Sequence, residues 1–173
     1  MKLKDNNLSK SFLIQINQNT GILHKVSKIY FDGKEDREDV IQEMMYQLWH
    51  SFSTFNGNSK FSTWMYRVCI NTALTYNRKN RKKIVITVPN IPDTIEVLDN
   101  DSLEESIVIL MHCISKLTKL NKAIILLFFE NLTYEEIASI TGLSKSNVSV
   151  RLVRIKREIE NNFNKSKGTD EEV

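Results

Sequence analysis

The sequence predicts an all-α fold of two small helical domains joined by a flexible acidic linker. Only five glycines and two prolines occur among the 173 residues, and apolar side chains recur at helical spacing through most of the chain. The pattern breaks at residues 84–102, which hold both prolines and four acidic residues but no basic one. We therefore expect a first domain at 1–83, a linker at 84–102, a second domain at 103–163 and a disordered tail at 164–173.

The composition also limits the chemistry. Cys69 and Cys113 lie far apart in apolar helical patterns, and the three histidines are scattered. This favours buried free thiols over a metal site or a Cys/His nucleophile, so we expect no catalytic residues, no metal and no cofactor. The N-terminal apolar run is too short for a signal peptide, and no later run reaches the ~20 residues of a membrane span. We expect a cytoplasmic protein without membrane insertion.

The first domain begins with two helices between residues 9 and 31, which separate near Gly21. A further helix follows, which we expect to be capped by Asp36 and to run through Trp49. On this helix Asp36, Asp39 and Glu43 recur at spacings of three and four and form an acidic face. An acidic first turn ordinarily complements the positive end of the helix dipole. The functional alternative is a docking surface for a basic partner.

Residues 52–61, FSTFNGNSKF, are predicted to form a loop by their Ser, Asn and Gly content. Three phenylalanines stand in this stretch. Either they tuck beneath the loop as part of the core, or they are exposed for binding. The loop leads directly into the most basic part of the chain.

The stretch from Lys60 to Lys83 holds seven cationic residues and no acidic one, interleaved with four aromatic rings. Four polar residues spaced by seven, four and seven share one face of the predicted helix: Lys60, Arg67, Asn71 and Arg78. Trp64 lies at the edge of that face. Cations neutralise phosphates, and an aromatic ring stacks an unpaired base for roughly 1 to 3 kcal/mol. The helix therefore favours single-stranded nucleic acid, and the alternative is a solvated helix with a basic tail.

The linker that follows is by default a solvated spacer, although its negative charge could also mimic nucleic acid in a basic channel. Its first residues, IVITV, could form a short strand.

The second domain ends in a helix-turn-helix pattern, after two amphipathic helices between residues 103 and 130. Thr133 with Glu136 matches a capping box, Gly142 ends that helix, and Ser144 caps a longer basic helix. The inward stripe of the longer helix consists of Val148, Leu152, Ile155 and Ile159.

The second helix of this motif enters the major groove, with its N-terminal residues nearest the bases. Here these are Lys145, Ser146, Asn147, Ser149 and Val150. Arg151 and Arg154 come later, where phosphate contact or support of the fold is expected. The alternative is a structural helix pair with a solvated basic face.

In this order, the segments resemble regions 2 and 4 of the extracytoplasmic-function (ECF) sigma factors of bacterial RNA polymerase. Region 2 is suggested by GILHKVSKIYFDG, DREDVIQEMMYQLW, the loop with its phenylalanines, and FSTWMYRVCINTA with RKNRKK. Region 4 is suggested by LTYEEIASITGLSKSNVSVRLVRIKREI. Two independent motifs in the right order are more specific than a lone helix-turn-helix.

Family members have two helical domains on a flexible linker and direct core RNA polymerase to promoters. The resemblance implies a polymerase-binding set: Asp36, Asp39, Gln42, Glu43 and Trp49. It implies a set that captures the melted minus-ten element: Phe55, Asn56, Gly57, Asn58, Ser59, Lys60, Phe61, Trp64, Arg67, Asn71, Arg78 and Lys79. It implies a set that reads the minus-thirty-five element as duplex: Ser144, Lys145, Ser146, Asn147, Ser149, Val150, Arg151 and Arg154.

The resemblance further implies a linker that threads toward the polymerase cleft and an inhibitory anti-sigma partner. That partner could clamp together two domains that we otherwise expect to move independently.

The second domain departs from the family pattern at two places. Residues 146–151 read Ser-Asn-Val-Ser-Val-Arg where the family usually has a run similar to Gly-Thr-Val-Lys-Ser-Arg, and Leu120-Asn121 stands where a proline is usual. The base preference therefore does not carry over. We expect a sigma factor that acts by binding, and the alternative is a helix-turn-helix transcriptional regulator without sigma activity. A nucleic-acid-processing enzyme would need an acidic metal site.

Overall fold

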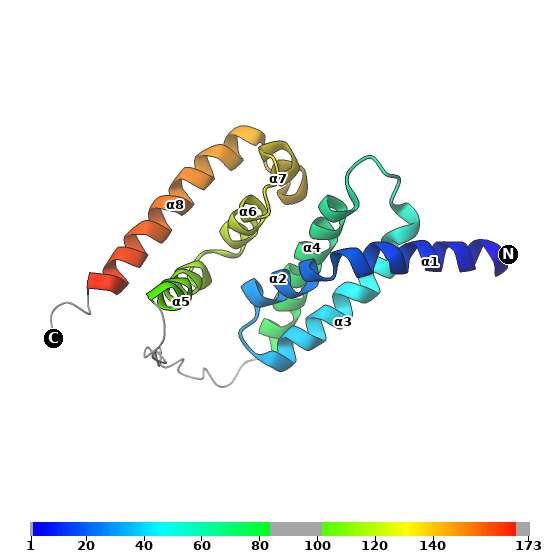
Figure 1. The fold of residues 1–173 in the computed structure, drawn as a ribbon, viewed down its shortest axis with the longest axis horizontal. Helices are drawn as coiled ribbons and strands as arrows, with labels where there is room; N and C mark the ends of the chain where they lie inside the picture. The colour runs from blue at the N-terminus through cyan, green and yellow to red at the C-terminus, as the bar shows by residue number, and fades with distance from the viewer. Residues whose placement is uncertain (1, 84–101, 169–173) are drawn as a thin grey trace.

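The computed structural model describes residues 2–83 and 102–168, and within these ranges all the regular structure is helical, which confirms the predicted fold class. Figure 1 shows two groups of helices side by side. The N-terminal group contains α1 (Lys2–Asn19), α2 (Gly21–Tyr30), α3 (Lys34–Ser51), the 3-10 helix η1 (Phe52–Thr54) and α4 (Phe61–Lys83). The C-terminal group contains α5 (Ser102–Ser115), α6 (Lys119–Phe129), α7 (Tyr134–Thr141) and α8 (Lys145–Gly168).

The start of α3 differs from the expectation. Its N-cap is Gly33, whose φ of −70° and ψ of 141° are extended, and Asp36 lies inside the first turn. The Arg37 side chain reaches back over this start, and its Nη2 donates to the Asp32 carbonyl at 3.0 Å. The expected cap at Asp36 is therefore wrong, because the chain already turns helical after Gly33.

Helices α2, α3 and α4 enclose the core of the N-terminal group. Val26, Val40, Met44, Leu48 and Met65 are completely buried. Burying a side chain of this size contributes roughly 1.5–3 kcal/mol relative to leaving it exposed. The packing fixes which faces of α3 and α4 point outward, and those faces carry the residues of interest.

The helix-turn-helix forms as predicted. Thr133 and Glu136 make a complete capping box, with the Thr133 hydroxyl accepting from the Glu136 N–H and the Glu136 carboxylate accepting from the Thr133 N–H. Gly142 ends α7 in the left-handed region at φ 74°, which glycine adopts without a Cβ penalty. The predicted stripe of α8 is buried, with Val148, Leu152 and Ile155 at most 1% exposed and Ile159 at 9%.

Helix α8 continues further than expected. It runs to Gly168, so residues 164–168, predicted to belong to a disordered tail, are helical. Phe163 packs against the core, and beyond it Ser166 Oγ donates to the Asn162 carbonyl at 3.0 Å. Residues 169–173 lie outside the described residues.

The predicted linker also falls almost entirely outside the described residues, which resume at Ser102, the first residue of α5. The expected IVITV strand lies there too. The two helical groups nevertheless touch: α2 packs on α5 and α6, and α4 packs on α7. The expectation that they move independently in the free protein stays a prediction, and so do the domain boundaries.

Candidate nucleic-acid interface

The basic face predicted for α4 is exposed at the positions whose side chains the structure describes. Lys60, Arg67, Asn71 and Arg78 are all exposed along the helix and at its start, while the side chain of Lys79 lies outside the description. The opposite side of α4 is buried in the core through Met65, Cys69, Ile70 and Ala73. One helix thus carries an apolar face toward the protein and a cationic face away from the N-terminal core.

Four aromatic rings gather at the start of this face. Trp64 is half-buried, with its ring centroid 5.3 Å from both Phe55 and Phe61 and 6.3 Å from Phe52. Phe52 and Phe61 are buried at 7% and 8% exposure, whereas Phe55 is half-buried. Two of the three loop phenylalanines therefore tuck into the core. Phe61, expected at the DNA surface, lies beneath it, because its ring fills the space under Phe55 and Trp64.

The loop between η1 and α4 has a defined shape. Asn56 Oδ1 accepts from the Asn58 N–H at 3.2 Å, which makes a local turn, and Gly57 has φ 76°. Four successive residues are exposed, namely Asn56, Gly57, Asn58 and Ser59. They connect Phe55 to the start of α4, where Trp64 lies.

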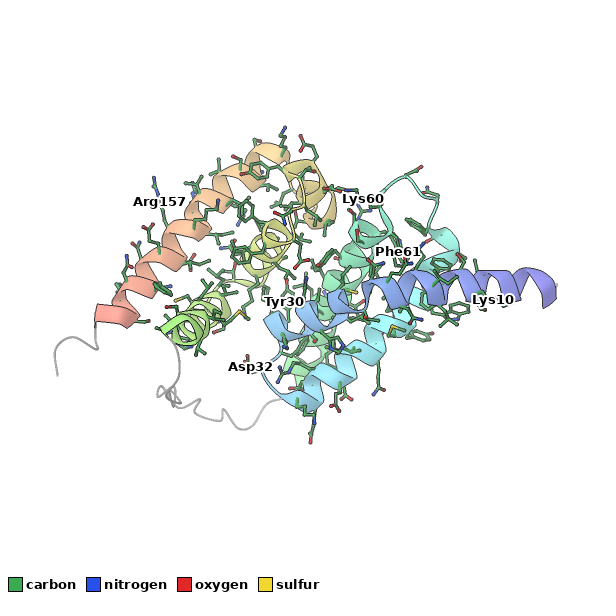
Figure 2. All side chains as sticks on the ribbon, in the orientation of Figure 1. Lys10, Tyr30, Asp32, Lys60, Phe61 and Arg157 are labelled. Carbon is green, nitrogen blue, oxygen red and sulfur yellow. The ribbon has the colours of Figure 1, made fainter. Side chains whose placement is uncertain are left out.

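Two polar groups of α4 are engaged by the C-terminal group. Arg67 Nη2 donates to the Ser139 carbonyl at 2.8 Å and also to the Ser139 hydroxyl. Thr63 Oγ1 donates to Glu136 Oε1 at 3.1 Å. Figure 2 shows Lys60, at the start of α4, facing α7. Ser139 could not be predicted, since nothing in the local pattern of α7 marks it as a partner of Arg67.

The N-terminal end of α8 presents the expected duplex-reading residues. Ser144 Oγ accepts from the Asn147 N–H at 3.2 Å and caps the helix. Among the predicted residues, six are exposed and Ser149 and Arg151 are half-buried; the exposed ones are Ser144, Lys145, Ser146, Asn147, Val150 and Arg154. Lys145 forms an ion pair with Glu135 on α7. Since both side chains are exposed, this ion pair contributes little to stability.

A groove beside α8 adds a residue that the sequence did not single out. Its volume is about 280 Å³, and its lining includes Asn147, Val150, Arg151 and Arg154 together with Asn121 of α6. Asn121 Oδ1 accepts a long hydrogen bond from Arg151 Nη1 at 3.5 Å. A helix-spacing argument within α8 alone could not have found it.

The acidic face of α3 is also exposed. Asp36, Asp39, Gln42 and Trp49 are exposed, and Glu43 is half-buried and accepts from Gln47 Nε2 at 2.8 Å. Trp49 is 45% exposed and packs edge-on against Phe12 of α1, with the two ring centroids 5.1 Å apart. Tyr46 is 60% exposed and lies three residues after Glu43, so it continues the same face. The helical spacing could have predicted Tyr46 as a member of this face.

The described part of the chain was also searched for metal sites, reactive cysteines and membrane-spanning helices. It holds no group of three or more His, Cys, Asp or Glu side chains placed to bind a metal. Both cysteines are buried free thiols, as the sequence predicts. Of the described helices, none combines the length and apolarity needed to cross a bilayer.

The fold and these surfaces define a two-part helical nucleic-acid-binding protein with a C-terminal helix-turn-helix. Comparison with known proteins identifies its family. The sigma-70 region 2 family model matches residues 16–83, and the sigma-70 region 4 model matches residues 107–159. The chain belongs to the sigma-70 family and is an RNA polymerase sigma factor of the ECF type.

Named relatives agree with this assignment. The chain is 28% identical over 155 residues to RNA polymerase sigma factor SigV of Bacillus subtilis, covering 88% of this chain and 91% of SigV. It is 31% identical over 153 residues to the ECF RNA polymerase sigma-E factor of Escherichia coli K12, covering 80% of each chain. The fold matches that of the sigma factor RpoE of Bartonella quintana, solved in complex with the anti-sigma factor NepR, with a TM-score of 0.73 at 15% identity over 90% of this chain and 98% of RpoE.

Proposed function

We propose that the protein binds core RNA polymerase through the exposed face of α3 and promoter DNA through two separate surfaces. The surface formed by the residue 55–60 loop and α4 captures the melted minus-ten element. The N-terminal half of α8 reads the minus-thirty-five element as duplex. The observation that carries this proposal is the opposition of faces on α4: a buried apolar side fixes the helix, and the exposed side combines cations with the Trp64 ring.

Within this proposal, strand capture is divided among three kinds of residue. Lys60, Arg67 and Arg78 neutralise phosphates of the single strand. Trp64 and Phe55 offer ring surface to an extruded base, with the loop amides of Asn56 and Asn58 hydrogen-bonding its edge. Phe61 takes a supporting role below the rings, since it is buried.

Promoter opening then follows from differential binding. The loop and α4 contact bases only when these are unstacked, so binding shifts the equilibrium toward the melted strand. The protein needs no covalent step for this, and we propose that it acts by binding alone. Sigma factors as a family are not enzymes, and action on promoters beside polymerase supports a cytoplasmic location.

The acidic face of α3 supports the polymerase contact. Asp36 and Asp39 project from the first turns, and Trp49 and Tyr46 supply exposed aromatic surface toward the other end. Charge complementarity with a basic surface steers association, and aromatic residues supply anchoring area. An anti-sigma partner that competes for these same surfaces is part of the proposal.

Reconstitution tests this function. The full chain with core RNA polymerase is presented with a randomised promoter library, and open templates are selected and sequenced. We expect two enriched boxes at fixed spacing and transcripts initiated downstream of them. Binding of duplex DNA without any initiation would instead support a helix-turn-helix regulator without sigma activity.

A further inference from the structure

An exposed valine lies in the middle of the outward face of α8. Val150 is 51% exposed and takes no part in the hydrophobic core. It stands two residues after Val148 and two before Leu152, both of the buried stripe, so helical geometry turns it to the opposite side of the helix. On that side it lies beside Asn147, three residues earlier, and Arg154, four residues later. Its methyl groups are therefore free to contact an apolar group of a ligand.

Several polar side chains at the start of α8 already have partners within the protein. Ser144 Oγ and Ser146 Oγ lie 3.0 Å apart and share a hydrogen bond, and Arg151 donates to Asn121. The side-chain amide of Asn147 differs. It is exposed and has no hydrogen-bond partner among the described residues. This amide can thus offer a donor and an acceptor to the same ligand.

Asn147 and Val150 line the same groove, the one of about 280 Å³ beside α8. Three residues of an α-helix advance about 4.5 Å, and successive base pairs of B-DNA lie about 3.4 Å apart. With the N-terminal half of α8 in a major groove, the two side chains therefore face neighbouring base pairs. Arg154 lines the groove as well, so a cation accompanies the two neutral side chains.

The chemistry of the two side chains selects particular bases. Adenine presents N7 as an acceptor and its N6 amino group as a donor, which an asparagine amide matches with two hydrogen bonds. Among the four bases only thymine carries a C5 methyl group in the major groove, against which an apolar side chain packs.

We propose that Asn147 reads an adenine of the duplex element and that Val150 packs on the C5 methyl group of a thymine in the neighbouring base pair. The inference rests on the proposed duplex-reading role of α8. It assigns a base preference to residues 146–151, whose departure from the family pattern prevents such a preference from being carried over.

Val153 provides a matched control. It is also 51% exposed on α8, but it lies three residues further along and does not line the groove. Val153→Ala therefore removes the same two methyl groups as Val150→Ala without changing base reading. Val150→Thr, which keeps one of the two methyl groups, is the conservative variant. Circular dichroism verifies that each variant is folded.

The test uses the full-length protein with core RNA polymerase. Duplexes that this complex retains in a gel shift are selected from a random library, with core polymerase alone as the background. Selection on binding keeps the test independent of initiation. In the selected element each thymine is then replaced in turn by uracil, which lacks only the methyl group. Each adenine is replaced by 7-deazaadenine, which lacks the N7 acceptor, and competition binding gives the relative affinities.

We expect one thymine at which uracil weakens binding by the wild-type protein about fourfold, the loss of one buried methyl group. At an adenine of a neighbouring pair, 7-deazaadenine should weaken binding about 2- to 10-fold, the loss of one hydrogen bond. Val150→Ala should remove only the uracil effect, and Asn147→Ala only the 7-deazaadenine effect. Val150→Thr should keep part of the uracil effect, and Val153→Ala should keep both effects in full.

Two results would overturn the proposal. If uracil is tolerated at every thymine, or if its effect persists in Val150→Ala, Val150 does not read a methyl group. If the 7-deazaadenine effect is absent or survives in Asn147→Ala, Asn147 does not read an adenine. Failure of the proposed function has a different signature: both base effects present, with no initiation by the same complex on promoter templates.

Discussion

Arg67 of α4 donates a hydrogen bond of 2.8 Å to the main-chain carbonyl of Ser139 on α7, 72 residues away in the sequence. The same guanidinium reaches the Ser139 hydroxyl. A residue proposed to contact the melted strand is thus held by the domain proposed to read duplex DNA. The contact therefore joins the two proposed DNA-binding surfaces directly.

Asn71 offers the cleanest test of strand capture. Replacing Asn71 with alanine should slow open-complex formation about 2- to 10-fold, the loss expected for one hydrogen bond, while leaving polymerase affinity unchanged. Because Asn71 is exposed, the free energy of unfolding should change by less than about 0.5 kcal/mol. Permanganate reactivity of the promoter reports opening. Asn161→Ala, at another exposed asparagine, is the matched control. If Asn71→Ala weakens polymerase binding as much as it slows open-complex formation, Asn71 has a structural role instead.

The acidic face of α3 should determine affinity for core polymerase. Asp36→Lys reverses an exposed charge on the proposed docking face, so we expect an affinity at least about tenfold lower, with most of the change in association rate at low salt. Glu158→Lys makes the same charge change at an exposed position of α8, away from α3, and serves as the control. Equal effects of the two variants would show that only net charge matters.

Duplex reading should depend on Arg154, which is exposed and lines the groove beside α8. If Arg154 contacts a phosphate, Arg154→Ala lowers the slope of log affinity against log salt by about one. Lys10→Ala, which removes a charge from the distant α1, should leave the slope unchanged (Figure 2). The measurement is a salt titration of duplex binding by holoenzyme. A change confined to one base position, with the slope intact, would indicate direct base readout.

The capping box of α7 should contribute to stability in a pH-dependent manner. Thr133→Ala should lower the free energy of unfolding by about 1 kcal/mol in urea. The hydrogen bond from the Thr133 N–H lowers the pKa of Glu136 below its ordinary 4.5, so the Glu136 contribution is complete above that pH and is lost as the pH falls through the folded-state pKa. Glu136→Gln keeps a capping residue and should lack this acid-side loss. An unchanged acid profile in that variant would assign the loss to other carboxylates.

The two thiols should be unreactive in the folded protein. Cys69 and Cys113 are 0% and 1% exposed, and burial raises the pKa of Cys69 to about 12. At pH 8 the thiolate, which is the reactive form, is therefore scarce and covered. A chromogenic disulfide reagent should react slowly in native buffer and with two equivalents in urea. Rapid native reaction of one equivalent would reveal local opening around that cysteine.

Local patterns were sufficient for much of the fold. The spacing of Val148, Leu152 and Ile155 predicted the buried stripe of α8, because helix periodicity alone decides which residues share a face. Gly142 and the Thr133 capping box are likewise signals carried within a few residues. The start of α3 was misplaced because Asp36 and Gly33 both suit a helix start, and backbone geometry chose the earlier one.

The candidate site was less predictable where burial and long-range contacts decide. Phe55 and Phe61 belong to the same predicted loop and have the same chemistry, and both rings pack against Trp64. Phe61, which also packs against Phe52, is buried, whereas Phe55 is half-buried. Tyr46 lay within reach of a spacing argument, whereas Asn121 and Ser139 gave no local signal.

By itself, the sequence determined the helical class, the order of the acidic, basic and helix-turn-helix segments, and the family resemblance, because these depend on residue type and spacing over short distances. The tertiary structure decided which aromatic rings support the α4 surface and which remain accessible on it. It alone brought Arg67 to Ser139 and Lys25 to Glu130. Such pairs depend on how whole helices pack, and the spacing of residues along one helix contains no record of what a distant helix will place opposite it.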